Sequence, residues 1–479
     1  MTEPPAATAA KDRTTAIFVV TALGAFMASL DLSIVNIAFP ALERSFPHDA
    51  LSALSWVITG YAIAFGSLLV VAGRTADRLG ARRVFFVGLG VFCVASALCG
   101  VAPTLPLLIA GRIVQGFGAA AMLPSSLGLL LASVPLAKRT VTVARWAGVG
   151  ALAVATGPTL GALLVTAGGW RWVFYVNVPI GVAAWAAGRV VLPRTAPDAS
   201  RSAPDYLGAV LVCGALGALV LGLTQGPTWG WATAGTLGCM AAFVVVGIAF
   251  VLRCARHPEP VLDLRLFSSR TFSVANSAMV LYAVGFFGML LGNILFLRGV
   301  WHYTVLDAGL AVTPGPLVVA CVSSSAGKLA GRIGFRAVLI CGSVVLATGL
   351  LLYAVRVGVH PDYLAVWLPS TLLIGLGIGL TFPVLGATAV SSLAPERFSV
   401  GSAVNQTARQ VGGSVGIALL VVILGTSPVA PLSSFRHLWE FGAAMSVLSG
   451  FVCLLLPPRS RASGATASAV TARATAVTR

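Results

Sequence analysis

The sequence predicts an all-α membrane protein that crosses the bilayer fourteen times, as two six-helix bundles with two extra helices between them. The chain of 479 residues is 58% hydrophobic and only 9% charged, whereas about a quarter of the residues in a soluble domain are charged. Uncharged stretches long enough to span a bilayer recur along the whole chain. A twelve-residue loop pattern occurs twice, eight spans apart, which indicates two related halves.

The first span follows the polar segment "MTEPPAATAAKDRTT", and no small-residue cleavage site comes after a short apolar core. We therefore expect this span to be retained and not removed as a signal peptide. Thirteen further spans follow, separated by short polar segments. The predicted spans are about 15–39, 51–73, 84–102, 105–132, 146–167, 172–192, 205–224, 230–252, 271–296, 307–327, 337–355, 363–391, 401–427 and 438–457.

The net charge of +17 comes from basic residues whose distribution agrees with the predicted topology. Lys and Arg concentrate in the cytoplasmic loops of membrane proteins. With the N-terminus inside, 24 of the 31 Lys and Arg residues lie in or beside inner segments. Five lie on the outer side and two within spans: Arg44, Arg171, Arg298, Arg356 and Arg436 outside, Arg112 and Arg409 within. We therefore expect a multi-pass cell-membrane protein with both termini cytoplasmic and no nucleic-acid partner.

The residue types that usually carry catalysis or bind metals form no recognisable pattern. The eight cysteines contain no CxxC pair, and the five histidines show no metal-ligand spacing. No nucleophile elbow, phosphate-binding loop or paired-carboxylate arrangement is visible. The sequence therefore predicts no metal, no cofactor and no enzymatic activity.

The repeated pattern reads "GRTADRLGARRV" at residues 73–84 and "GKLAGRIGFRAV" at residues 327–338, with six of twelve positions identical. Two six-span bundles would place these loops six spans apart, so two additional spans lie between the halves. Internal repeats of this kind are common in transporters, with a binding site between the halves. The expected parts are a cytoplasmic tail at 1–13, an N-terminal bundle at 14–193, a linker with two helices at 194–256, a C-terminal bundle at 257–458 and a disordered cytoplasmic tail at 459–479.

The first span contains "ASLDLSIVNIAFP", residues 28–40, which places Asp31 in an apolar run. A charge at the centre of a membrane helix costs about 2.5–3.5 kcal/mol on insertion scales. At the helical rise, Asp31 lies about 12 Å below the outer end of its span, and Arg112 of the fourth span lies about 10 Å deep. Because both charges sit at nearly one depth in one half, we expect them to face each other or an aqueous cavity.

Asp31 has three interpretations: it exchanges a proton, it meets a cationic group of a substrate, or it forms a static ion pair that only fixes packing. Burial favours the neutral acid and Arg112 favours the ionised one, so a change in their distance would switch its protonation. Arg112 cannot titrate, and it either takes part in this coupling or orients its neighbours. Gln115 and Asn36 add polar atoms near this layer, as cavity lining or as bridges between helices.

Span 5 contains "GALAVATGPTLGALL", in which Pro158 removes a backbone donor and kinks the helix. Gly157 and Gly161 form a GxxxG face for close helix contact, so this span is either a gate element or ordinary packing.

In the loop "GRTADRLGARR", Asp77 either holds a helix N-terminus or an arginine in one transport state, or belongs to a simple positive-inside turn. Arg409 lies about 12 Å above the inner end of span 13. Its side chain is either a partner for another group on the inner face or a snorkelling residue.

Over about residues 14–457 these motifs resemble the major facilitator superfamily, specifically its 14-span drug:proton antiporter branch. "LDLSIVNIAFP" is similar to the span-1 signature of that branch, with Asp31 at the acidic position and Ser33 where threonine is usual. "GRIVQGFGAAAMLP" matches the span-4 motif associated with proton coupling, at Arg112, Gln115 and Gly116. "WRWVFYVNVPIG" and "GSAVNQTARQVGGSVGIA" are also typical of the branch.

Two further motifs support the resemblance. "GPTLGA" resembles the span-5 antiporter motif, with Ala162 in place of its last glycine, which favours a gating role for Pro158 and its glycines. "GRTADRLGARRV" resembles the superfamily's loop motif, and the positions that carry over are Gly73, Asp77, Arg78, Gly80 and Arg82.

The resemblance implies a major facilitator fold and proton-driven export of a drug, an antibiotic or a related small organic compound by alternating access. Its expected partners are this substrate, protons and membrane lipid, and we expect a monomer. The first alternative is a proton-coupled or facilitative transporter of a metabolite on the same fold. The second is a non-transporting membrane scaffold or receptor, in which Asp31 and Arg112 at one depth would be unnecessary.

Overall fold

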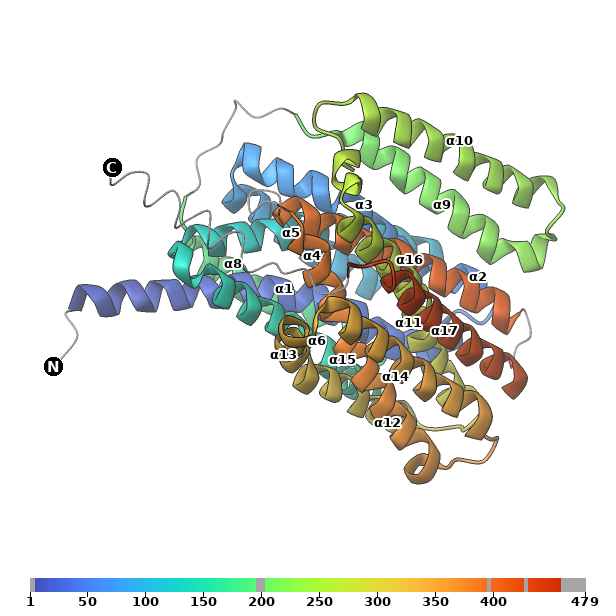
Figure 1. Cartoon of the computed structure of the whole chain (residues 1–479). Coiled ribbons are helices and arrows are strands. Elements are labelled where there is room, and N and C mark those ends of the chain that lie inside the picture. The colour runs from blue at the N-terminus through green and yellow to red at the C-terminus, as the bar shows by residue number, and fades with distance from the viewer. Residues whose placement is uncertain (1–4, 195–202, 394–397, 426–429, 458–479) are drawn as a thin grey trace.

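The computed structural model describes residues 5–194, 203–393, 398–425 and 430–457. The secondary structure of these residues is helical (Figure 1). The helices of the first half are α1 (Pro5–Ser45), α2 (Leu51–Leu54), α3 (Trp56–Leu79), α4 (Ala81–Val101), α5 (Leu105–Ala132), α6 (Leu136–Gly168), α7 (Trp172–Tyr175) and α8 (Asn177–Val191). Those that follow are α9 (Tyr206–Trp229), α10 (Ala234–Arg256), η1 (Leu264–Ser268), α11 (Arg270–Gly299), α12 (Val305–Val312), α13 (Pro314–Ile333), α14 (Phe335–Arg356), η2 (Tyr363–Trp367), α15 (Leu368–Ser391), α16 (Phe398–Leu424) and α17 (Leu432–Cys453).

Each predicted span overlaps one helix or two consecutive helices, but the count of fourteen stays a prediction. In the described parts of the chain, 12 helical segments are long and apolar enough to cross a membrane, or 13 if the bent α6 is one span. The helix α17 overlaps the last predicted span but is not among them, because its first half carries Arg436, His437 and Glu440. Helix α1 begins at Pro5, inside the predicted N-terminal tail. The predicted tail at 459–479 lies outside the described residues.

The helices α1 to α8 pack together as one lobe, and α11 to α17 as a second. In the first lobe, α4 and α5 pack closely because small residues let their backbones approach. A Cβ on Gly118 would lie 2.6 Å from the backbone nitrogen of Phe92 and 2.8 Å from the carbonyl oxygen of Gly88. In the second lobe, α17 packs on α11 and α14, and the indole of Trp439 donates to Asn293 Oδ1 at 2.9 Å.

The two lobes meet where α3 packs on α16, where α6 packs on α12 and α13, and where α1 packs on α11 and α12. Helix α3 packs on α16, where Thr407 Oγ1 donates to the carbonyl oxygen of Gly66 at 2.7 Å. Helix α6 packs on α12 and α13, and the hydroxyls of Thr159 and Thr313 are 2.7 Å apart across this contact. A Cβ on Gly309 would lie 2.6 Å from Cβ of Ala162, so α12 fits against α6 only with a residue this small.

The extra helices α9 and α10 lie on the outside of the bundle, beside the contact between α3 and α16 (Figure 1). Helix α9 packs on both α3 and α16, and therefore touches both lobes. Helix α10 packs on α9, and only 6% of its most apolar 18-residue window is buried, against 89% for the segment Leu51–Leu79. In a bilayer, the exposed apolar side chains of α10 would face lipid.

Candidate functional site

Asp31, Arg112 and Gln115 form one hydrogen-bonded cluster between α1 and α5. Arg112 Nη1 donates to Asp31 Oδ2 and to Gln115 Oε1, each at 2.6 Å. Gln115 Nε2 donates to the other carboxylate oxygen, Asp31 Oδ1, at 2.9 Å. The side chains from spans 1 and 4 therefore face each other, which is one of the two arrangements expected from their depth.

Four more side chains surround this cluster: Ser96, Asn177, Tyr61 and Phe174. Ser96 accepts from Gln115 at 2.6 Å and from Asn177 at 3.1 Å, and Asn177 also lies 3.4 Å from Asp31 Oδ1. The guanidinium of Arg112 lies 4.3 Å from the ring centre of Tyr61 and 5.6 Å from that of Phe174. None of the four was predicted from the sequence as a site residue, although Ser96 and Asn177 are polar residues within apolar spans and could have been found as such.

All three charged or amide side chains of the cluster, Asp31, Arg112 and Gln115, are 0% exposed. Burying an ion pair costs several kcal/mol per ion, which is offset only when hydrogen bonds satisfy the remaining polar atoms. Arg112 Nε donates to the carbonyl oxygen of Val57 at 2.8 Å, whereas Arg112 Nη2 has no hydrogen-bond partner among the described residues, so the need is met only in part. Asn36 does not join the cluster, because its amide donates to the carbonyl oxygen of Leu32 on its own helix at 2.7 Å.

The same segment of α1 also contacts the proline of α6. Pro158 has no backbone N–H, so the carbonyl oxygen of Val154, four residues earlier, lacks its helical donor. Ser33 Oγ donates to this oxygen at 3.1 Å. The axis of α6 bends by 42° between the segments 148–154 and 156–168. Ser33, two residues after Asp31, thus binds α6 at its bend.

Gly157 and Gly161 provide the close contact between α6 and α1. A Cβ on Gly157 would lie 2.5 Å from Cβ of Ser33, and one on Gly161 would lie 2.8 Å from Cγ1 of Ile34. Both glycines therefore face the helix that carries Asp31, as a small-xxx-small face does in membrane bundles.

The repeated loops share one backbone feature. Gly80, between α3 and α4, has φ +93°, and Gly334, between α13 and α14, has φ +95°. Residues with a Cβ rarely adopt this region, so both halves need glycine at the same position of the motif. Arg82 Nη2 donates to the carbonyl oxygen of Arg189 at the end of α8, at 2.8 Å.

The other loop residues remain near α3 and its end. Asp77 is exposed, and Arg78 lies in the last turn of α3. Gly73 faces α5, because a Cβ at this position would lie 3.6 Å from Cβ of Pro124. The structure therefore places this loop away from the Asp31 cluster, as a separate candidate element.

Arg409 of α16 lies against aromatic side chains and not against an acid within the described residues. Its guanidinium is 5.3 Å from the ring centre of Phe382, and its Nε has no hydrogen-bond partner. Phe382 in turn contacts Tyr282 and Phe286, at 5.7 and 6.1 Å between ring centres. The neighbouring Gln410 is 1% exposed and both of its side-chain polar atoms lack partners, which is unusual for a buried amide.

The chain belongs to the Major Facilitator Superfamily, whose family pattern matches residues 21–417. Solved transporters of similar shape include a mutant of the nucleoside transporter NupG, with a TM-score of 0.64 and 11% identity over 93% of this chain and 100% of that one. A bacterial homologue of the human drug peptide transporters PepT1 and PepT2 has a TM-score of 0.63 and 16% identity, over 92% of this chain and 97% of that one. These similarities establish the fold.

Sequence relatives include resistance and export proteins. The chain is 35% identical over 410 residues to the tetracenomycin C resistance and export protein of Streptomyces glaucescens, covering 85% of this chain and 75% of that one. It is 33% identical over 438 residues to the methylenomycin A resistance protein of Streptomyces coelicolor, covering 91% and 89%. It is 32% identical over 413 residues to a multidrug resistance protein B homolog of Mycobacterium tuberculosis, covering 84% and 74%.

Proposed function

We propose that this protein exports a small organic compound, such as a drug or antibiotic, in exchange for protons by alternating access. The observation that carries the proposal is the buried carboxylate of Asp31, held by Arg112 at 2.6 Å on helices of one lobe. Ionisable groups within membrane spans typically serve ion or substrate pathways. The resistance and export names of the relatives support this substrate class. The basic inner segments support cytoplasmic termini, and because one chain carries both lobes, we propose a monomer.

The contacts around Asp31 suggest how a proton would move the lobes. Protonation removes the charge that Arg112 binds, and a buried guanidinium without its counter-ion favours rearrangement of α1 against α5. Helix α1 carries Ser33, which bonds to α6 at its bend, and α6 meets the second lobe at Thr159 and Thr313. One path from the acid to the contact between lobes 14–193 and 257–458 therefore passes through α1 and α6, and α1 also contacts α11 and α12 directly.

Transport by inside-out membrane vesicles tests the proposal against its alternatives. Vesicles containing the protein are energised to acidify their interior, and compounds from an antibiotic panel are then added while the proton gradient is followed by a quenched acridine dye. We expect at least one compound to dissipate the gradient faster than in vesicles without the protein. Transport that is insensitive to a protonophore and stops at equal concentrations inside and outside would favour a facilitator, and transport of none of the panel would favour a scaffold or receptor.

Cross-linking the two lobes tests alternating access. In Thr159→Cys/Thr313→Cys the sulfur atoms replace hydroxyls that lie 2.7 Å apart, so a disulfide can form in this state. Oxidation is expected to lower transport about tenfold or more because the lobes can no longer separate here, and a reductant restores it. Each single cysteine variant is the matched control. Full transport by a protein shown to be cross-linked would rule out separation at this contact.

The surroundings of Arg409 favour aromatic substrates without a positive charge. Both oxygens of Asp31 are already engaged, and its side chain is 0% exposed, so it is closed to a cationic drug in this state. Arg409 instead offers a guanidinium beside Phe382, at the helix that packs on the first lobe. Arginine binds anionic oxygens and stacks on aromatic rings. We propose that this position binds phenolic or otherwise acidic aromatic compounds.

Arg409→Gln is expected to weaken transport of an acidic aromatic compound about tenfold, as loss of one charge-assisted contact implies. Transport of a neutral compound should change much less. The matched control is Arg356→Gln, an exposed arginine at the end of α14. Concentration dependence of vesicle transport separates the effect on apparent affinity from that on maximal rate. Equal losses for acidic and neutral compounds would contradict the role in substrate choice.

A further inference from the structure

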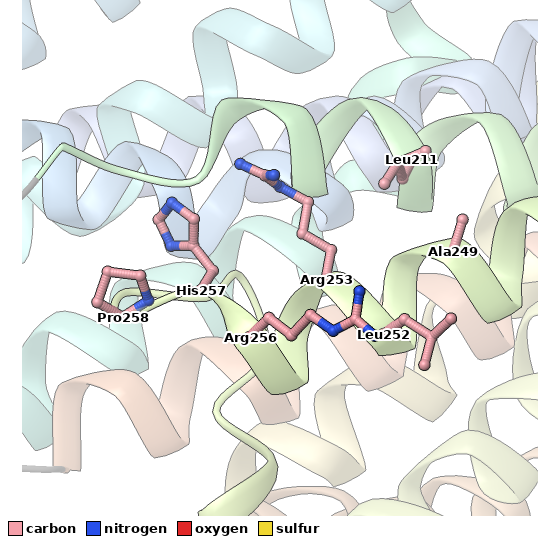
Figure 2. Close-up of a pocket in the computed structure, with 7 residues that line it drawn as sticks. All are labelled: Leu211, Ala249, Leu252, Arg253, Arg256, His257 and Pro258. Atoms are coloured by element: carbon pink, nitrogen blue, oxygen red, sulfur yellow. The ribbon is translucent and has the colours of Figure 1, made fainter.

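A pocket of about 450 Å³ opens at the outside of the bundle, where α10 ends beside α9. It is lined by Leu211, Ala249, Leu252, Arg253, Arg256, His257 and Pro258, drawn in Figure 2. The end of α10, whose residues line the pocket, lies at the end of the bundle that carries the start of α1, which is the cytoplasmic end in the proposed orientation (Figure 1). None of its residues belongs to the Asp31 cluster, and Leu211 also packs against the apolar cluster that α9 forms with α3 and α16.

Arg253 and His257 lie at the polar end of the pocket, and the guanidinium of Arg256 extends toward Leu252 (Figure 2). Arg253 Nε donates to Asp205 Oδ1 at 2.6 Å, which fixes this arginine against the N-terminus of α9. Burial raises the pKa of Asp205, but hydrogen bonds from the Gly208 N–H and from Arg253 outweigh it, and the pKa lies below its usual value. The carboxylate is therefore ionised at neutral pH and neutralises Arg253 in part.

Arg256 and His257 remain available for an anion. Arg256 is exposed and has no ion pair with any described residue. His257 Nδ1 accepts from the backbone N–H of Glu259 at 3.1 Å. A neutral ring with that acceptor carries its proton on Nε2, so His257 offers an N–H donor there.

The other end of the pocket is apolar and continuous with a lipid-facing surface. Leu211, Ala249 and Leu252 line it, and Leu252 is 49% exposed. One and two turns before Leu252 in α10, Ile248 and Val245 are 56% and 66% exposed. A soluble anion would gain no free energy from this apolar surface, whereas an acyl chain would bury it.

We propose that this pocket binds one anionic phospholipid of the inner leaflet, with its phosphate at Arg256 and His257 and an acyl chain along Ala249 and Leu252. Basic pockets between membrane helices on the cytoplasmic side suit anionic headgroups. The proposal rests on the orientation proposed above. The bound lipid lies next to Glu259, which pairs with Arg74 of the first lobe at 3.2 Å. It therefore joins the extra helices to the first lobe at the α3 end that carries the repeated loop.

Lipid binding is measured by native mass spectrometry of the full chain after delipidation in detergent and titration with phosphatidylglycerol or phosphatidylcholine. We expect one phosphatidylglycerol to bind more tightly than any phosphatidylcholine. Arg256→Gln is expected to weaken this binding about tenfold, through loss of a charge-assisted contact. Ala249→Trp fills the apolar end without changing charge and should weaken it similarly. Arg270→Gln, another exposed arginine at the same end of the bundle, is the matched control and should bind as the wild type does.

Unchanged phosphatidylglycerol binding in both Arg256→Gln and Ala249→Trp would overturn the proposal. Displacement of the lipid by glycerol phosphate at an equal concentration would also overturn it, because the pocket would then recognise a soluble phosphate. The measurement counts bound lipid and not transport, so its failure would leave the export function standing, and a failure of the vesicle assay would leave the lipid site standing.

Discussion

Asp31→Asn is expected to reduce drug protection to the level of cells without the protein. Asparagine has nearly the same shape and can still accept a hydrogen bond from Gln115, but it cannot gain or lose a proton. Arg112 loses its counter-ion, which lowers stability, but it keeps its bonds to Gln115 and to the carbonyl oxygen of Val57, so we expect the variant to fold and insert. Susceptibility to an antibiotic panel, with the amount of protein in the membrane measured in parallel, checks this result.

The matched control for Asp31→Asn is Asn36→Ala on the same helix. Within the described part of the chain, the Asn36 side chain bonds to the carbonyl oxygen of Leu32 alone, so its removal should change protection by about twofold or less. Equal protection by the wild type and by Asp31→Asn at equal protein levels would contradict the proton-coupling role of Asp31. Protection against neutral compounds that survives in Asp31→Asn would limit that role to charged substrates.

Arg112→Gln is expected to destabilise the protein, because it removes one partner of the buried ion pair. It leaves a carboxylate buried at 0% exposure without its counter-ion. Removing one partner of a buried ion pair typically costs about 3–5 kcal/mol. A lower unfolding temperature in detergent, followed by tryptophan fluorescence, and a lower amount of protein in the membrane should report this loss.

The double variant Asp31→Asn/Arg112→Gln separates the stability of the pair from its function. Removing both charges leaves no unpaired ion, so much of the stability lost in Arg112→Gln should return. Transport should not return, because no titratable group remains at this position. Strictly additive effects of the two changes would mean that the side chains are not coupled, contrary to their 2.6 Å contact.

The helices were predictable because apolar runs of bilayer length leave the chain few alternatives. A backbone in lipid must satisfy its own hydrogen bonds, and a continuous helix does this within one segment. The ends of the helices were less predictable, because polar residues next to a span can continue it. Helix α1 extends back to Pro5, and α6 begins at Leu136 and not near residue 146. Helix α17 packs on α11 and α14 of the second lobe, although Arg436, His437 and Glu440 lower its apolar character.

The candidate site was predictable only in its charged members. Asp31 and Arg112 stood out because charges are costly in apolar runs, and their depths followed from helical rise alone. Ser96 and Asn177 were missed, because single serines and asparagines occur in many membrane helices without forming a site. Asn36 was selected for its polarity, but in the structure it bonds to its own helix.

The sequence by itself determined that this chain is an all-helical membrane protein of two related halves, because hydropathy and repeated loops are properties of local sequence. Only the tertiary structure decided which polar atoms meet: Ser33 with the carbonyl oxygen freed by Pro158, Arg409 with Phe382, and the basic end of α10 with the apolar surface beside it. Depth in a span can be counted along a helix, but the rotation of each helix about its axis is set by packing against its neighbours. That rotation is what turns a polar residue toward a partner, its own helix or lipid.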